Sequence, residues 1–372
     1  MKKKYIILSI IVLVLLITFV TSFNYFKTSN NYVEDSVNNQ TKIIKGISMN
    51  LEQTAGAGDY KTVTQSSWPT EGYKFNTELS RCENGSTLSW DDSKKAVVMN
   101  GNVSDKCYVY FDKVLTLANY VISQYTGIQG ENSLYYHDSN LANGVGDNSY
   151  RYSGASDSVN NYICLGSDAT TCPDANLFRI IGVFGDQTKV IRAKSVGDKE
   201  WNTSDDNTWS TSSLNTYLNG EYLTSLGTLA DKIATTTWKV GGGSSTYLYD
   251  VPTTAYQYEV GSSASTTTYD AKIGLMYVSD YGFAADQSGW TTKLSSYNSN
   301  KSKNWLNTGR YIEWTLSRNS DNTSNAFGVN STGYVDNYNV TKSYVVRPSF
   351  NLESSVKYVS GSGSMSDPVR VN

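Results

Sequence analysis

The chain has 372 residues, of which 39% are hydrophobic, 13% aromatic and only 17% charged. Its 31 Lys and Arg residues against 34 Asp and Glu residues give a formal net charge of −3. Nucleic-acid binding needs a clustered basic face, so we expect no nucleic-acid partner. The single histidine excludes most acid–base mechanisms that depend on imidazole.

An uncharged, mostly apolar stretch from Tyr5 to Phe26 follows three lysines at positions 2–4. Its length matches the roughly 20 residues that a helix needs to cross a bilayer. The lysines favour a cytoplasmic N-terminus, which places the rest of the chain outside the cell. The alternative is a signal peptide cleaved near Val20-Thr21-Ser22, but the long apolar run favours a retained, single-pass anchor.

Changes in composition and in hydrophobic patterning divide the rest of the chain into segments. The predicted fold class is α+β. A polar stalk follows the anchor, and short alternating runs then predict a small β module. In that module, STLSW and AVVMN flank a turn opened by Asp91 and Asp92, and CYVYF is the most strand-prone run. Apolar residues at helical spacing between Lys113 and Tyr125 predict a connecting helix. The boundaries are 1–27 for the anchor, 28–45 for the stalk, 46–112 for the β module, 113–129 for the helix and 130–372 for the large domain.

The large domain alternates short strands with a few helical segments, which favours an α+β domain over a βαβ repeat. Asn176–Phe184 and Lys189–Lys194 predict a buried hairpin. Residues 211–227 predict two short helices that stop at Gly220 and Gly227. Residues 272–284 predict an apolar strand, and short strands with Gly and Asn turns complete the domain.

Four cysteines in an exported chain indicate disulfide bonds. Of the three possible pairings, we expect Cys82–Cys107 and Cys164–Cys172, because each pair falls inside one local unit. The chain has no C-x-x-C pair, and its only histidine is far from any pair, so a zinc site is not expected.

The C-terminal region carries, in order, Tyr311–Thr315 (YIEWT), Ala326–Val329 (AFGV), Gly333–Val335 (GYV) and Val346–Leu352 (VRPSFNL). This order resembles the end of C-type-lectin-like domains of the formylglycine-generating-enzyme type. It is still more similar to uncharacterised surface proteins of Gram-positive bacteria. The resemblance implies a C-type-lectin-like fold for the large domain.

The resemblance does not extend to a known activity. Formylglycine-generating enzymes act through a pair of cysteines near the end of the domain, and this chain has no cysteine after Cys172. The E-P-N, Q-P-D and W-N-D runs of calcium-dependent sugar binders are absent as well.

Aromatic residues are the main candidates for ligand binding. The chain has 29 Tyr and 8 Trp but only 10 Phe, so most of its aromatic side chains carry a polar group. Tyrosine and tryptophan suit contact surfaces, and binding residues gather on loops. An exposed aromatic platform and ordinary surface tyrosine are both open interpretations. The tryptophans near Ser-, Thr-, Asn- and Gly-rich loops are Trp201, Trp209, Trp238, Trp290 and Trp305.

The remaining candidate residues favour structural interpretations. Glu313, beside Trp314, is expected to pair with Arg347 and hold the fold together. The acidic residues Asp205 and Asp206 lack the regular spacing of ligands in a calcium-binding loop, and we expect them in a solvent-exposed turn. His137 is expected in an ordinary surface or loop position. We expect no metal or cofactor, and GGGSS at 241–245 lacks the context of a phosphate-binding loop.

Three function classes remain open. The first is a membrane-anchored extracellular binding or adhesion protein for a glycan or a surface protein, without enzymatic activity. The second is a cell-envelope glycan hydrolase using Glu313 with Asp280 or Asp286, which requires the two carboxyls roughly 5–9.5 Å apart in one cleft. The third is a purely structural envelope component. The absence of a recognisable catalytic set favours the first class.

Overall fold

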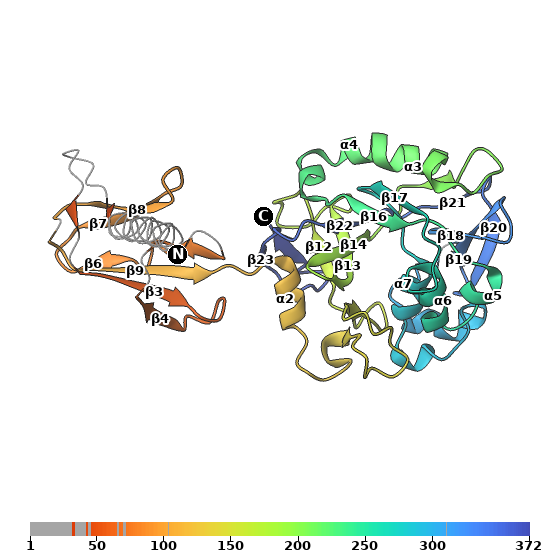
Figure 1. Cartoon of the computed structure of the whole chain (residues 1–372), viewed down its shortest axis with the longest axis horizontal. Helices are drawn as coiled ribbons and strands as arrows, with labels where there is room; N and C mark the ends of the chain where they lie inside the picture. The colour runs from red at the N-terminus through yellow and green to blue at the C-terminus, as the bar shows by residue number, and fades with distance from the viewer. Residues whose placement is uncertain are drawn as a thin grey trace, which may run out of the picture. The chain divides into compact units, whose positions relative to one another are not determined.

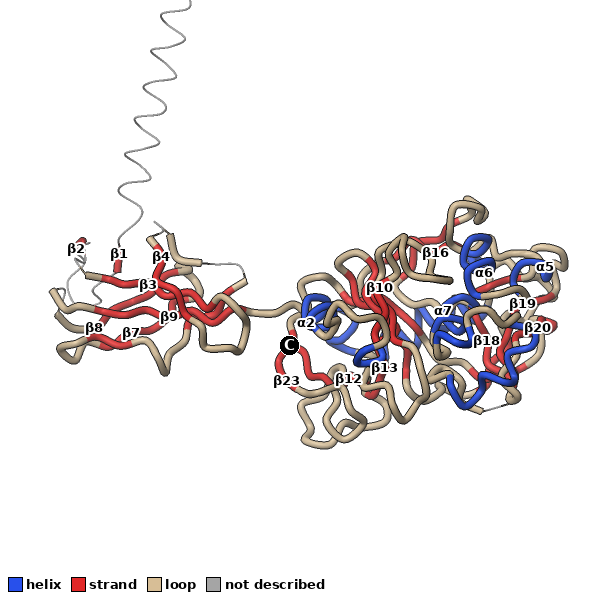
Figure 2. The backbone as a smooth tube through the Cα atoms, turned by 90° about the horizontal axis from the view of Figure 1, so that it is seen from below, coloured by secondary structure: helices blue, strands red, loops and turns tan. Residues whose placement is uncertain are grey.

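The computed structural model describes residues 32–33, 42–43, 46–64, 67–69, 72–102, 104–309 and 311–372. The chain divides into two compact units, the first ending at Leu115 and the second beginning at Thr116 (Figure 1). The predicted anchor at 5–26 and most of the predicted stalk lie outside the described residues. Within the described part, no helix is long and apolar enough to cross a membrane. The architecture is mixed α+β, with more strands than helices in the part described (Figure 2).

The first unit contains a five-stranded sheet with β3 and β9 as inner strands. These two strands run parallel, whereas every other pairing in the sheet is antiparallel. The predicted hairpin forms a separate two-stranded sheet, in which β7 pairs with β8. The strands are β3 (Ile47–Glu52), β4 (Tyr60–Val63), β5 (Tyr73–Phe75), β6 (Arg81–Cys82), β7 (Thr87–Asp91), β8 (Ala96–Asn100) and β9 (Cys107–Lys113), and β1 (Tyr32–Val33) pairs with β2 (Lys42–Ile43).

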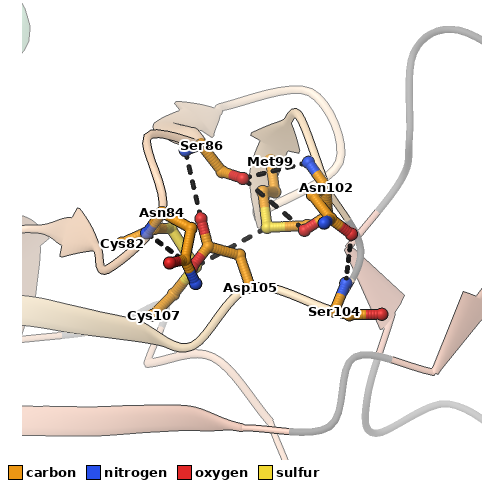
Figure 3. The surroundings of a disulfide bond; sticks show 8 residues. All are labelled: Cys82, Asn84, Ser86, Met99, Asn102, Ser104, Asp105 and Cys107. Atoms are coloured by element: carbon orange, nitrogen blue, oxygen red, sulfur yellow. Dashed lines mark hydrogen bonds between the residues drawn. A yellow bond between two sulfur atoms is a disulfide. The ribbon is translucent and has the colours of Figure 1, made fainter.

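The predicted disulfide Cys82–Cys107 is present and joins β6 to β9 at a paired position. Beside it, the Asp105 carboxylate accepts hydrogen bonds from the backbone N–H groups of Asn84 and Ser86 (Figure 3). The sulfur of Cys107 is fully buried next to Met99. The bridge therefore fixes the edge of a sheet whose core is small: Met49, Leu51, Phe75, Val97, Val109 and Phe111.

We expect replacement of both Cys82 and Cys107 by serine to destabilise the first unit by about 3 kcal/mol, because the bridge closes a loop with a sequence separation of 25. Hydrogen exchange of the β9 amides, resolved by peptide mass, measures this change. The matched control is the Cys164–Cys172 double serine variant, which should leave β9 protection unchanged. Equal β9 protection with and without the Cys82–Cys107 bridge would contradict the prediction.

The second unit is built on an eight-stranded sheet with β13 at its centre. One edge of β13 pairs with β11 and β12 at different positions along the strand, and the other edge pairs with β14, the predicted hairpin partner. The second disulfide, Cys164–Cys172, is also present as predicted. The strands are β10 (Leu134–Tyr136), β11 (Tyr150–Tyr152), β12 (Tyr162–Cys164), β13 (Leu177–Phe184), β14 (Gln187–Arg192), β22 (Ser349–Leu352), β23 (Tyr358–Ser360) and β24 (Val369–Val371).

A second sheet and a ribbon complete the strands of this unit. The sheet has the order β15-β21-β18-β19-β20, and β16 pairs with β17 as a separate ribbon. The short strands predicted after residue 311 are therefore confirmed. Their bounds are β15 (Asp198–Glu200), β16 (Thr236–Lys239), β17 (Thr268–Ala271), β18 (Ile312–Arg318), β19 (Asn325–Asn330), β20 (Val335–Asn339) and β21 (Ser343–Val345).

The helices of the second unit are short. The helix predicted between Lys113 and Tyr125 is α2, and it packs Leu117, Ala118 and Val121 into the core of this unit. Helices α6 and α7 lie side by side (Figure 1). The bounds are α2 (Leu117–Ser123), α3 (Ser213–Tyr217), α4 (Leu223–Ser225), α5 (Ser245–Leu248), α6 (Pro252–Glu259) and α7 (Val278–Phe283).

The predicted stop at Gly220 is wrong, because the helical run continues from α3 through a π-helical turn at Leu218–Tyr222 into α4. The buried side chains of Leu218 and Tyr222 flank the glycine and hold the turn against the core. The stop at Gly227 is confirmed for the α-helix, since this residue adopts a φ of +57° just after α4 and begins a 3-10 helix that extends to Lys232.

The strand predicted at residues 272–284 is also wrong: its first half makes only an isolated bridge at Gly274, and its second half forms α7. All six residues of α7 are buried, so the segment shows no helical alternation of polar and apolar residues. Two carboxylates satisfy the N–H groups at its start. Asp280 accepts from Tyr277, and Glu259 accepts from Val278 and Ser279.

Candidate functional site

A cavity of about 240 Å³ lies on one face of the eight-stranded sheet, and we call it the ion-pair cavity. Strands β11, β14 and β22 contribute Arg151, Lys189 and Asn351, and Lys189 lies directly opposite Asn351. The ribbon strand β16 and the helices α6 and α7 form the remaining walls. The full lining is Asp147, Arg151, Phe184, Lys189, Thr236, Thr237, Trp238, Lys239, Tyr256, Val260, Tyr277, Ser279, Asp280 and Asn351.

The close approach of β11 to β13 positions Arg151. Arg151 lies opposite Gly182 of β13. A Cβ atom at position 182 would lie 2.1 Å from the carbonyl oxygen of Tyr150, so a side chain there would force β11 away from β13. The register of β13 also shifts between Ile180 and Gly182 where it pairs with β14. Glycine at this position therefore allows β11 to bring Arg151 to the cavity.

Two ion pairs line the cavity. Arg151 Nη2 lies 2.7 Å from Asp147 Oδ2, and Arg151 Nε donates to the Ser149 hydroxyl at 2.8 Å. Lys189 Nζ lies 2.5 Å from Asp280 Oδ2, and Arg151 Nη1 lies 3.8 Å from Asp280 Oδ1. Both cationic side chains and Asp280 are almost fully buried. Buried charges are stable only when paired in this way.

Arg151 keeps Asp147 ionised. Burial by itself acts to raise the pKa of Asp147, but the Arg151 charge and hydrogen bonds from the side chain and backbone of Ser149 outweigh it and lower the pKa to about 2. The Tyr256 hydroxyl donates to the same carboxylate at 3.0 Å. Burial, the Asp147 charge and this hydrogen bond raise the pKa of Tyr256 to about 12, although Arg151 opposes the shift. At neutral pH, Asp147 is therefore an acceptor and Tyr256 a donor.

Aromatic rings surround both cations. Lys189 Nζ lies 4.6 Å from the ring centroid of Tyr277, 5.4 Å from that of Trp238 and 5.7 Å from that of Phe184. Arg151 lies 4.6 Å from the Phe184 centroid and 5.4 Å from that of Tyr256. The cavity thus combines charged hydrogen-bonding groups with aromatic faces, the composition typical of small-ligand sites.

A third carboxyl, Glu259, lies at the end of α6 and does not line the cavity. Besides the α7 N–H groups, it accepts a hydrogen bond from the Ser317 hydroxyl. Complete burial raises the pKa of Glu259 to about 7, since the hydrogen bonds from Ser279 and Val278 only partly offset the loss of solvation. This group fixes the start of α7, which in turn positions Ser279 and Asp280.

The five tryptophans expected on binding loops are core residues, so the predicted exposed platform is not formed by them. Each is at most 2% exposed. Four indole N–H groups donate to backbone carbonyls, which explains how such large side chains are buried beside polar loops. Only Trp238 lines the cavity; the others are Trp201, Trp209, Trp290 and Trp305.

The ion pair expected between Glu313 and Arg347 is present. Arg347 Nε lies 2.7 Å from Glu313 Oε1, and Arg347 Nη2 donates to the Leu306 carbonyl. Trp314 is buried next to Glu313 and donates to the Lys199 carbonyl. These three side chains connect β18 to neighbouring segments and take no part in the cavity.

The carboxylates of the hydrolase hypothesis do not line one cavity. Asp280 lines the ion-pair cavity, Glu313 pairs with Arg347, and Asp286 accepts from the backbone and hydroxyl of Ser288 in a turn. The run Asp205-Asp206 also lies in a turn, where Asp205 accepts from Asn339. Among the described residues, no group of three or more His, Cys, Asp or Glu side chains could hold a metal ion.

His137 lies in a loop after β10, as one of the two expectations had it, but not at the surface. The side chain is 0% exposed and packs against the rings of Phe283 and Trp290, at centroid distances of 5.0 and 5.2 Å. Neither ring nitrogen has a hydrogen-bond partner in the described part of the chain. Burial and the nearby Arg151 charge lower the pKa of His137 well below 6.5, so the ring is neutral.

The sequence reasoning missed Arg151, Lys189, Asp147 and Tyr256. The only local signal is at Arg151, which lies between two tyrosines on β11, whereas β14 is largely polar and carries a second cation, Arg192. A lone charge within a strand that is otherwise buried indicates a buried partner elsewhere.

Residues 185–354 match a family model described as Domain of unknown function (DUF6273). The match covers less than half of the chain. It includes the cavity residues on β14, β16, α6, α7 and β22, whereas Asp147 and Arg151 precede it. No curated protein and no solved structure matches the chain. The protein is thus a disulfide-bonded α+β chain of two units, and part of its second unit is similar to this family.

We expect His137→Phe to reduce the loss of stability at acidic pH. The folded state holds the histidine neutral while the unfolded chain binds a proton below about pH 6.5, so this group stabilises the fold above that pH and the stability is lost as the pH falls. Between pH 7 and pH 5 the variant should lose about 1–2 kcal/mol less than wild type. Urea denaturation at both pH values measures the difference, and parallel losses in both proteins would contradict it.

Proposed function

We propose that the protein is a membrane-anchored extracellular binding or adhesion protein, and that its second unit binds one sugar unit of a surface glycan in the ion-pair cavity. The observation that carries this proposal is the convergence of Arg151, Asp147 and the aromatic rings on one small cavity. A sugar ring offers an apolar face to aromatic side chains and hydroxyl groups to charged hydrogen-bonding groups.

The size of the cavity supports a single ring. Drug-sized ligands occupy pockets of roughly 300–1,000 Å³. The ion-pair cavity has about 240 Å³. A terminal or side-branch sugar fits such a volume, whereas the remainder of the glycan would lie outside it. A protein ligand would have to insert one side chain.

The charges in the cavity support binding more than hydrolysis. Glycoside hydrolysis needs one carboxyl that stays protonated and a second that acts as base or nucleophile. The pKa of Asp147 is about 2, and Asp280 is in contact with Lys189. Both carboxyl groups of the cavity are thus paired with cations, which suits hydrogen-bond acceptors better than a general acid.

We further propose a C-type-lectin-like fold for the second unit and a relationship to surface proteins of Gram-positive bacteria. In support, Glu313-Trp314-Thr315 lies on β18, and β18 pairs antiparallel with β19, which carries Phe327-Gly328-Val329. This arrangement agrees with the motif order that suggested the resemblance. The two disulfides support an extracellular location, since such bonds persist in oxidising compartments.

We expect Tyr256→Ala to weaken glycan binding about tenfold, because it removes a cavity wall and the hydroxyl that orients Asp147. The matched control is Tyr258→Ala on the same helix, since Tyr258 stacks on Tyr247 and does not line the cavity. The full chain is screened on a glycan array, and calorimetry with the best free monosaccharide compares the variants. Equal weakening by both variants, or no retained glycan, contradicts the proposed site.

We expect the intact chain to be found in the membrane fraction and to be digested by protease added outside whole cells. The apolar segment 5–26 is the anchor in this proposal. All four cysteines should resist a thiol reagent until a reductant is added, whereas a cytosolic thiol protein should react at once. Recovery of the chain in the cytosol with four reactive thiols contradicts the proposed location.

A further inference from the structure

The Lys189–Asp280 contact has an unusual setting for an ion pair. It joins β14 to α7 across 91 positions of sequence, at a distance of 2.5 Å. The two side chains are only 6% and 3% exposed. Three aromatic rings enclose the ammonium group, as described above. The amino group and the carboxyl group are thus held in direct contact and shielded from bulk water.

Groups that stabilise an acyl-transfer intermediate are already in place around Asp280. The backbone N–H of Tyr277 donates to Asp280 Oδ2 at 2.8 Å. Arg151 Nη1 lies 3.8 Å from Asp280 Oδ1, and the shorter contacts of Arg151 are to Asp147 and Ser149. A fixed N–H donor and a nearby cation are what a negatively charged tetrahedral intermediate requires.

We propose that Lys189 and Asp280 become joined by an intramolecular isopeptide bond. Lys189 Nζ, as the neutral amine, attacks Asp280 Cγ of the protonated carboxyl group. A bond forms between Nζ and Cγ, the bond from Cγ to one oxygen breaks, and that oxygen leaves as water with one proton from the nitrogen. No oxidant, reductant or cofactor is needed, and the water has room in the adjoining cavity.

Fixed geometry is what makes the reaction feasible. The backbone of β14 is paired on both sides, by β13 and β22, and Asp280 is held at the start of α7. Two reacting groups positioned in this way behave as if at very high concentration, about 10⁵ M or more in favourable cases. The inference goes beyond the proposed function, since Asp147, Arg151 and Tyr256 remain available to a ligand whether or not the bond forms.

The test is peptide mass spectrometry of the purified full chain after reduction and complete proteolysis. We expect the peptides containing Lys189 and Asp280 to be recovered as one cross-linked species, lighter than their sum by one water molecule. Fragmentation should place the link at these two residues. Recovery of the two peptides unlinked overturns the proposal.

The chain supplies a matched control. Lys194 Nζ and Asp174 Oδ2 also lie 2.5 Å apart, but their side chains are 53% and 64% exposed. Water competes for both groups of such an exposed pair, so its peptides should be recovered unlinked. Lys189→Arg, which keeps the positive charge, should abolish the cross-linked species. A cross-link at Lys194–Asp174 as well, or one that persists in Lys189→Arg, shows that proximity or sample handling is the cause and overturns the proposal.

Discussion

Buried cations that each find an acceptor on a distant segment hold the second unit together. Arg179 reaches the Asn161 side chain and the Val159 carbonyl, and Arg347 reaches Glu313 and the Leu306 carbonyl. Arg151 and Lys189 do the same in the ion-pair cavity. Removal of one partner from such a pair leaves an uncompensated charge and costs about 3–5 kcal/mol. This requirement fixes which strands and loops come together, and the cavity is one of its products.

A recurring turn, held by hydrogen bonds from side chain to backbone, orders the loops. An Asp or Asn side chain accepts hydrogen bonds from both the backbone N–H and the hydroxyl of a Ser or Thr two residues later. This turn orders loops through local hydrogen bonds and needs no partner from a distant segment, which suits a chain with only 17% charged residues. It occurs at Asp91–Ser93, Asp147–Ser149, Asp286–Ser288, Asn330–Thr332 and Asn339–Thr341.

Local sequence patterns predicted the hairpins β7–β8 and β13–β14, the strands β9 and β18 to β22, and both disulfides, because alternation, turn residues and short cysteine spacing are local properties. They failed where contacts between distant segments determine the secondary structure or the burial of a residue. The segment of α7 is buried throughout, including its Ser279 and Asp280, so only the distant Glu259 and its own Asp280 reveal it as a helix. The five tryptophans were expected at the surface from their polar neighbours, but all are buried, and Trp201, Trp238 and Trp305 donate to carbonyl groups of distant segments. The ion-pair cavity draws residues from 147 to 351, and no local pattern marks such a set.

The strand β24 has a consequence for how the second unit acquires its structure. It pairs parallel to β12, and Arg370 donates to the carbonyl of Ser167, 203 positions earlier in the chain. β12 therefore lacks one of its two neighbours until synthesis has passed residue 371. Pairings this remote slow folding. The eight-stranded sheet can therefore be completed only after its last strand has been synthesised.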